Sequence, residues 1–137
     1  MEHPPFTVLV FSHIVQVRAD VRTAVGRRPA PELGRVEYVE CSDIDELIRH
    51  VDGGGVDLAI LDGEAQPTGG MGIARQLKHE IADCPAICVL IARADDRWLA
   101  TWSLADATLV HPLDPITATG VVADLLRRRG SGLPVRR

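Results

Sequence analysis

The chain has 137 residues, of which 46% are hydrophobic and 25% charged, and its formal net charge at pH 7 is −4. This size and composition fit one globular domain with its own core and exclude an intrinsically disordered chain. No apolar run approaches the roughly 18 residues of a membrane span, and the negative charge argues against general nucleic-acid binding.

The beginning of the chain and its cysteines indicate a cytoplasmic protein. The segment EHPPFTVLVF after Met1 has no basic region, and its short apolar run predicts a strand instead of a secretory signal. Cys41, Cys84 and Cys88 are odd in number, lie in or beside apolar runs and form no C-x-x-C pair. They therefore favour free buried thiols over disulfides or a zinc site.

The hydrophobic pattern alternates between strand and helix along the whole chain. In order, it predicts a strand at 7–11, a helix at 15–27, a strand at 35–41, a helix from Ser42 or Asp43 to about Val51, a strand at 56–61, a helix at 71–81, a strand at 86–92, a short helix at 97–103, a strand at 107–110 and a helix at 115–129. Glu46, three residues after Asp43, completes a capping-box pattern, and the glycines at 53–55 end that helix.

Alternation of this kind predicts right-handed crossovers and a doubly wound α/β domain, with helices on both faces of a parallel sheet. Functional sites in such sheets lie beyond the carboxyl ends of the strands. Asp62, which follows the apolar run VDLAIL, lies at such an end and is the first candidate site residue.

We find no internal repeat or linker, so residues 1–129 are predicted to form one domain. Residues 130–137 are predicted to be a disordered basic tail with no output domain after it. The arginines at the end of the last helix favour a solvated helix terminus, with nucleic-acid or membrane contact as the weaker alternative.

These features together resemble the receiver domain of two-component response regulators, over about residues 6–129. The resemblance rests on the order of the elements, Asp62 after the third strand, Pro67 and Gly70 in the next loop, and His111-Pro112 after the fifth strand. It implies a flavodoxin-like, five-stranded parallel sheet in the order 2-1-3-4-5. It also implies that Asp62 occupies the position that accepts a phosphoryl group from a histidine kinase.

Most positions that assist this chemistry in the family differ in this chain. The acidic pair, the Thr or Ser, the aromatic residue and the Lys of the family correspond here to Ser12 and His13, to Ile91 or Ala92, to Thr108 and to His111. One carboxylate, a hydroxyl and a backbone carbonyl make a poor Mg²⁺ cage, so we expect weak or absent Mg²⁺ binding, no other cofactor and no enzymatic activity.

The sequence therefore predicts an atypical receiver that acts through protein–protein interaction, with a histidine kinase or a non-kinase target as partner. The alternative is a functioning phospho-accepting receiver that uses Asp62. Trp98 and Trp102, spaced i, i+4, either pack on the sheet or contact a partner, and the face made by the fourth helix, fifth strand and last helix is a candidate homodimer interface.

Ser12, His13, Asp62 and His111 should be neighbours, which leaves three weaker alternatives. These are a His/carboxylate metal site, pH sensing by His111, and a hydrolase with Ser12 as nucleophile. The hydrolase has little support because no G-x-S-x-G motif is present, and nucleotide binding has none because the Gly-rich segment lacks G-K-[ST].

Overall fold

The computed structural model describes residues 5–64, 70–81, 84–98 and 103–130. In chain order the elements are β1 Phe6–Phe11, α1 Val15–Val25, β2 Val36–Cys41, α2 Ile44–Asp52, β3 Leu58–Asp62, α3 Gly70–Glu80, β4 Ala86–Ile91, the 3₁₀ turn η1 Ala94–Asp96, β5 Ala107–Val110 and α5 Pro115–Gly130.

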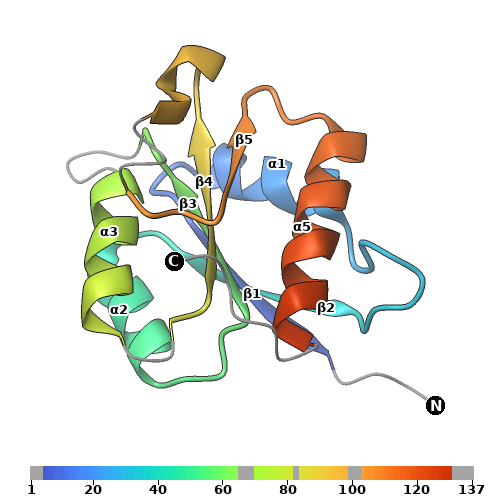
Figure 1. Ribbon diagram of the computed structural model, residues 1–137, viewed down its shortest axis with the longest axis horizontal. Coiled ribbons are helices and arrows are strands. Elements are labelled where there is room, and N and C mark those ends of the chain that lie inside the picture. The colour runs from blue at the N-terminus through green and yellow to red at the C-terminus, as the bar shows by residue number, and fades with distance from the viewer. Residues whose placement is uncertain (1–4, 65–69, 82–83, 99–102, 131–137) are drawn as a thin grey trace.

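The strands form one parallel sheet in the order β2-β1-β3-β4-β5 (Figure 1), which confirms the predicted fold class and strand order. The chain reverses its direction of winding between β1 and β3. The carboxyl ends of these two central strands therefore lie side by side at the upper edge of the sheet, where sites of doubly wound domains occur.

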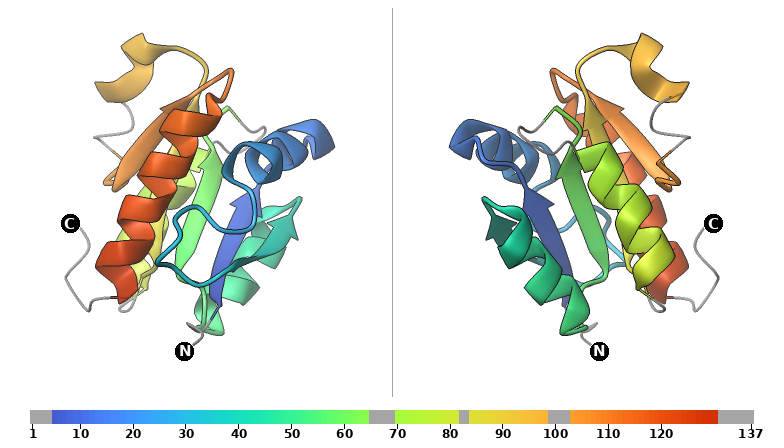
Figure 2. Two further views of the ribbon diagram at one scale, coloured as in Figure 1. Left: turned by 90° about the vertical axis from the view of Figure 1, so that its right-hand side faces the viewer. Right: turned by 90° about the vertical axis from the view of Figure 1, so that its left-hand side faces the viewer.

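Helices cover both faces of the sheet: α1 and α5 lie on one face, and α2 and α3 lie on the other (Figure 2). Strand β1 shows how the sequence produces this arrangement. Val8 and Val10 pack with α1 and α5, whereas Leu9 and Phe11 pack with α2 and α3, because successive side chains of a strand point to opposite faces. Strands β3 and β4 are buried throughout, which explains their continuous apolar runs.

The element boundaries differ from the predicted ones by one or two residues. Helix α1 ends at Val25 because Gly26 has φ +76°, a left-handed conformation that suits glycine. Strand β3 begins at Leu58, two residues later than predicted, and includes Asp62, which pairs with Leu90 of β4. Hydrophobicity marks Val56 as buried, but strand pairing begins only after Asp57.

The predicted caps of α2 are largely present. The Asp43 carboxylate accepts the N–H of Glu46 at 2.9 Å. The Glu46 side chain accepts the N–H of Ser42 at 3.2 Å, so the returning bond of the box reaches one residue further than predicted.

Some predicted features lie outside the described residues. Of the predicted helix 97–103, only residues 97–98 and 103 are described. Trp102, Pro67 and residues 131–137 of the predicted tail also lie outside the described residues.

Two aspartates fix the amino ends of neighbouring strands in the same way. Asp57 donates its N–H to the carbonyl of Thr7, and its carboxylate accepts the N–H of Thr7, both at 2.9 Å. Asp106 makes the same reciprocal pair with Ile87 at 2.8 Å. In addition, the Asp106 carboxylate binds Nζ of Lys78 at 2.7 Å, in an ion pair whose side chains are only 1% and 8% exposed.

The interior also holds two cysteines as buried free thiols, as predicted for Cys41 and Cys88. Burial raises the pKa of Cys88 to about 12 and that of Cys41 to about 11. Cys84, at the start of the turn into β4, is half-buried, so the prediction of burial holds fully for Cys41 and Cys88 only.

Within the described segments, no helix is long and apolar enough to cross a membrane.

Candidate functional site

The register of the two central strands places Asp62 beside Ser12. Phe11 of β1 pairs with Leu61 of β3, so the next residue of each strand emerges at the same level of the carboxyl edge. Gly63 then allows the chain to turn against β4. Its N–H donates to the carbonyl of Leu90 at 2.8 Å, and a Cβ at this position would lie 2.5 Å from that carbonyl oxygen. The glycine is therefore required by close approach.

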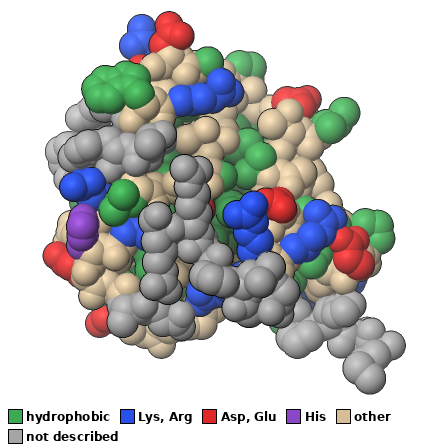
Figure 3. Space-filling model, in the orientation of Figure 1, with side chains coloured by type: hydrophobic (Ala, Val, Ile, Leu, Met, Phe, Trp, Pro, Cys, Tyr) green, Lys and Arg blue, Asp and Glu red, His purple; other side chains and the backbone are tan. Residues whose placement is uncertain are grey.

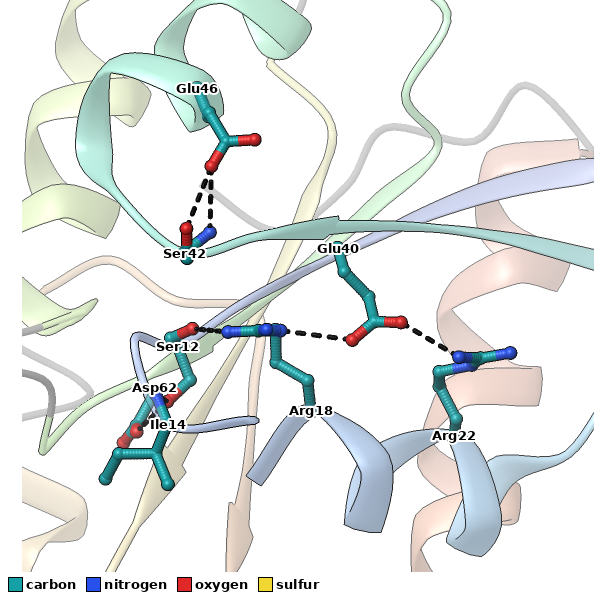
Figure 4. A network of polar contacts seen from close by, with 8 residues as sticks. All are labelled: Ser12, Ile14, Arg18, Arg22, Glu40, Ser42, Glu46 and Asp62. Atoms are coloured by element: carbon teal, nitrogen blue, oxygen red, sulfur yellow. Dashed lines mark hydrogen bonds and ion pairs between the residues drawn. The ribbon is translucent and has the colours of Figure 1, made fainter. Parts of the chain in front are cut away.

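Asp62 is buried, with 2% of its surface exposed, and both of its oxygens accept hydrogen bonds. The hydroxyl of Ser12 donates to Oδ2 at 2.8 Å (Figure 4). The N–H of Glu64 donates to Oδ1 at 2.9 Å. Ser12 Oγ in turn accepts the N–H of Ile14 at 3.0 Å. Asp62 thus joins the loop after β1 to the loop after β3.

A chain of charged contacts extends from Ser12 toward the edge of the sheet. Arg18 of α1 donates to the Ser12 carbonyl at 2.5 Å and to Glu40 of β2 at 3.0 Å, and Arg22 binds the other oxygen of Glu40 at 2.8 Å (Figure 4). The sequence analysis did not identify this network. The sequence does show two arginines four residues apart on one helix face. That Glu40 of β2 pairs with them could not be predicted, because it depends on the order of the strands.

The two histidines predicted for the site lie at the same edge without joining this network. His13 is exposed and His111 half-buried, and neither side chain makes a hydrogen bond with any described residue. The His111 N–H donates to the carbonyl of Ile91 at 2.9 Å, and its peptide bond to Pro112 is cis. Thr108 lies half-buried in β5.

The end of β4 offers no hydroxyl to the site. Ile91, its last residue, is fully buried, and Ala92 is exposed. Both are apolar, so neither can donate a hydrogen bond to a phosphoryl oxygen.

The oxygen ligands at Asp62 are a poor match for a divalent cation. Mg²⁺ requires near-octahedral oxygen ligands and favours carboxylates. Among the residues that the structure describes, Asp62 is the only buried carboxylate at this edge, and both its oxygens already accept hydrogen bonds. Among the described residues, no three His, Cys, Asp or Glu side chains form a group that could hold a metal ion.

The described large hydrophobic side chains that are exposed follow the carboxyl ends of strands. Ile14 (46% exposed) and Val15 (68%) follow β1, Trp98 (67%) follows β4, and Ile116 (85%) follows β5. Figure 3 shows hydrophobic side chains projecting beside η1 and near the start of α5. The sheet-packing alternative is therefore wrong for Trp98.

Comparison with known proteins identifies relatives of this chain. No protein-family model matches it. It is 55% identical over 120 residues to an uncharacterized response regulatory protein found in two strains of Mycobacterium tuberculosis, a match that covers 88% of this chain and 90% of each relative.

Solved structures support the same fold at low sequence identity. A protein of Chloroflexus aurantiacus assigned to the response regulators superimposes with a TM-score of 0.77 and 18% identity, covering 91% of this chain and all of that one. The receiver domain of a Francisella response regulator gives 0.73 and 15%, covering 89% and 97%. A chemotaxis response regulator of Vibrio cholerae gives 0.70 and 17%, covering 90% and 100%. The 55% identity over nearly the whole length, together with the topology, shows that this chain belongs to the response regulators and is a receiver of two-component signalling.

Proposed function

We propose that the protein is an atypical receiver that signals by binding a protein partner and that Asp62 is phosphorylated slowly or not at all. The hydrogen bond from Ser12 to Asp62 carries this proposal. Ser12 stands at a position where the family has a second carboxylate. The negative charge needed to hold Mg²⁺ is therefore missing next to the phosphoacceptor position.

The other substitutions act in the same direction. Phosphoryl transfer depends on positioning and on cationic stabilisation of the transferred group, and removal of one stabilising group typically costs on the order of 10² to 10³ in rate. His111 stands where the family has a fixed cation and supplies an imidazole in its place. Ile91 or Ala92 stands where the family has a hydroxyl side chain, so several such losses combine.

The exposed apolar side chains support binding of a protein partner at this end of the molecule. The exposed large hydrophobic side chains follow the carboxyl ends of β1, β4 and β5, at the end of the sheet that holds Asp62: Ile14, Val15, Trp98 and Ile116. Large exposed hydrophobic residues grouped at one end are typical of interaction surfaces, and Trp is over-represented among interface hot spots. The partner is a histidine kinase or a non-kinase target. A homodimer through the predicted helix 97–103, β5 and α5 is an alternative that analytical ultracentrifugation tests.

Chemical phosphorylation tests the proposal. The protein is incubated with acetyl phosphate or phosphoramidate and Mg²⁺, and its intact mass is measured. We expect no appreciable adduct in the wild type or in Asp62→Ala. A stoichiometric adduct on the wild type that is absent from Asp62→Ala would overturn the proposal.

A variant that restores the acidic pair provides the matched comparison. Ser12→Asp combined with His13→Asp places carboxylates beside Asp62, so calorimetric titration with Mg²⁺ should give heat with this variant and none with the wild type. The alternative function, a phospho-accepting receiver, is favoured only by the presence of Asp62 at the end of β3. It predicts Mg²⁺ binding by the wild type in the same titration.

A further inference from the structure

A groove of about 440 Å³ lies between α1 and β2 and shares Arg22 with the charged network described above. Its lining includes Arg22 and Thr23 of α1, Arg27 just beyond the end of that helix, and Val36 and Tyr38 of β2. We call it the α1–β2 groove. It is open to solvent, so its shape suits an extended segment better than an enclosed small molecule.

The α1–β2 groove is rich in hydrogen-bond donors and poor in acceptors. The Arg27 side chain is exposed and makes no ion pair or hydrogen bond with the described residues. Arg22 uses one nitrogen for Glu40, which leaves its other N–H groups available. The Tyr38 hydroxyl donates to the carbonyl of Gly26 at 2.5 Å, so that acceptor is already occupied. A ligand that supplies negatively charged acceptors satisfies these donors.

Arg22 is held in position before any ligand arrives. Its guanidinium lies over the Tyr38 ring, 5.7 Å from the centroid, and binds Glu40, which Arg18 holds from the other side (Figure 4). An arginine fixed in this way loses less conformational entropy when it binds a carboxylate. The network around Glu40 therefore prepares one of the two cations of the groove.

The local charge also favours an acidic ligand. The residues that line the α1–β2 groove include two arginines, Arg22 and Arg27, and no acidic residue, whereas the whole chain has a net charge of −4. Glu40 neutralises only one of the two arginines that it contacts. The groove is thus a locally positive surface on an acidic protein, which would attract acidic segments selectively.

We propose that the α1–β2 groove docks an acidic segment of a partner protein, with its carboxylates on Arg22 and Arg27 and its small apolar side chains on Val36 and Tyr38. This inference rests on the proposed function as far as it assumes a protein partner. It goes beyond that function because it locates a contact surface away from the carboxyl edge and specifies the charge of the ligand.

The experiment uses a fluorescein-labelled octaglutamate peptide and measures fluorescence anisotropy at 150 mM salt. We expect saturable binding to the wild type, about fivefold weaker binding to Arg27→Ala, as expected for loss of one exposed ion pair, and none to Arg27→Glu. Arg93→Ala is the matched control, because this arginine is 76% exposed and lies beyond β4. It should bind like the wild type, and octalysine should not bind.

NMR amide shifts give the location independently of affinity. We expect the peptide to shift the amide signals of Thr23, Gly26 and Arg27. Absence of binding, equal weakening by Arg27→Ala and Arg93→Ala, or shifts confined to other surfaces would each overturn the inference. The phosphorylation test does not depend on the α1–β2 groove, so failure of the proposed function and failure of this inference are distinguishable.

Discussion

The buried ion pair between Lys78 and Asp106 allows a test of how this fold tolerates charge. The two side chains meet at 2.7 Å with exposures of 8% and 1%. The Asp106 Oδ2 atom also accepts the N–H of Ile87, while Oδ1 is buried and has no hydrogen-bond partner in the described structure. Lys78→Met keeps most of the side-chain volume but leaves a buried carboxylate with one N–H donor.

Removal of one partner of a buried pair costs about 3–5 kcal/mol, because the other charge is left uncompensated. We therefore expect Lys78→Met to lower the free energy of unfolding at pH 7 by about 3 kcal/mol, measured by urea unfolding with circular dichroism. Arg93→Met breaks the exposed pair of Arg93 with Asp96 and should cost less than about 0.5 kcal/mol.

The loss in free energy of unfolding caused by Lys78→Met should depend on pH in a defined direction. Burial raises the pKa of Asp106, and Lys78 lowers it, so Lys78→Met raises this pKa further above the unfolded value of about 3.9. A raised folded-state pKa means that the penalty is complete above it and shrinks as the pH falls through it. The deficit should therefore be larger at pH 7 than at pH 5.

A double variant separates charge from packing. Adding Asp106→Asn to Lys78→Met removes the uncompensated charge, so the double variant should be more stable than the single one at pH 7. A loss of less than about 1 kcal/mol in the free energy of unfolding of Lys78→Met, or an equal loss at both pH values, would refute this reasoning.

Three further expectations concern backbone geometry and thiols. Leu104 has φ +67°, so Leu104→Gly should be about 1 kcal/mol more stable than Leu104→Ala in urea unfolding, because both remove the side chain and only glycine relieves the strain. Gly63→Ala should lower stability by about 2 kcal/mol, since its Cβ would collide with the Leu90 carbonyl. Cys41 and Cys88, with pKa values raised to about 11 and about 12, should resist a disulfide reagent at pH 8 until urea unfolds the protein.

The sequence predicts the fold well because its signals are local. Strand and helix alternate clearly, and the order of the sheet follows from the family resemblance, so the position of Asp62 at the end of β3 could be stated before the structure was known. Ser12 and His13, which follow β1, were also visible in the sequence. The hydrogen bond from Ser12 to Asp62 was not, because it depends on the register of β1 with β3.

Nonlocal contacts account for the residues that the sequence analysis missed. Lys78 is next to the apolar stripe of α3, where a lysine usually faces solvent, and only the approach of Asp106 from the β5 side buries it. Arg18 and Arg22 also resemble ordinary surface residues until Glu40 of β2 is placed between them. Trp98 is exposed although its i, i+4 spacing to Trp102 permits packing on the sheet.

The contact between Ser12 and Asp62 shows how this chain accommodates a buried carboxylate. Two carboxylates side by side cannot both stay ionised in a buried site unless a cation or a shared proton compensates them. Ser12 is uncharged and donates a hydrogen bond to Asp62, and Glu64 supplies a second donor from the backbone. The hydrogen bonds that satisfy the carboxylate also tie the loop after β1 to the loop after β3 through Ile14 and Glu64. The same serine that weakens the case for Mg²⁺ thus supplies a hydrogen-bond donor to the buried Asp62 carboxylate, so one side chain sets both the ligands available at this edge and the contacts that hold Asp62.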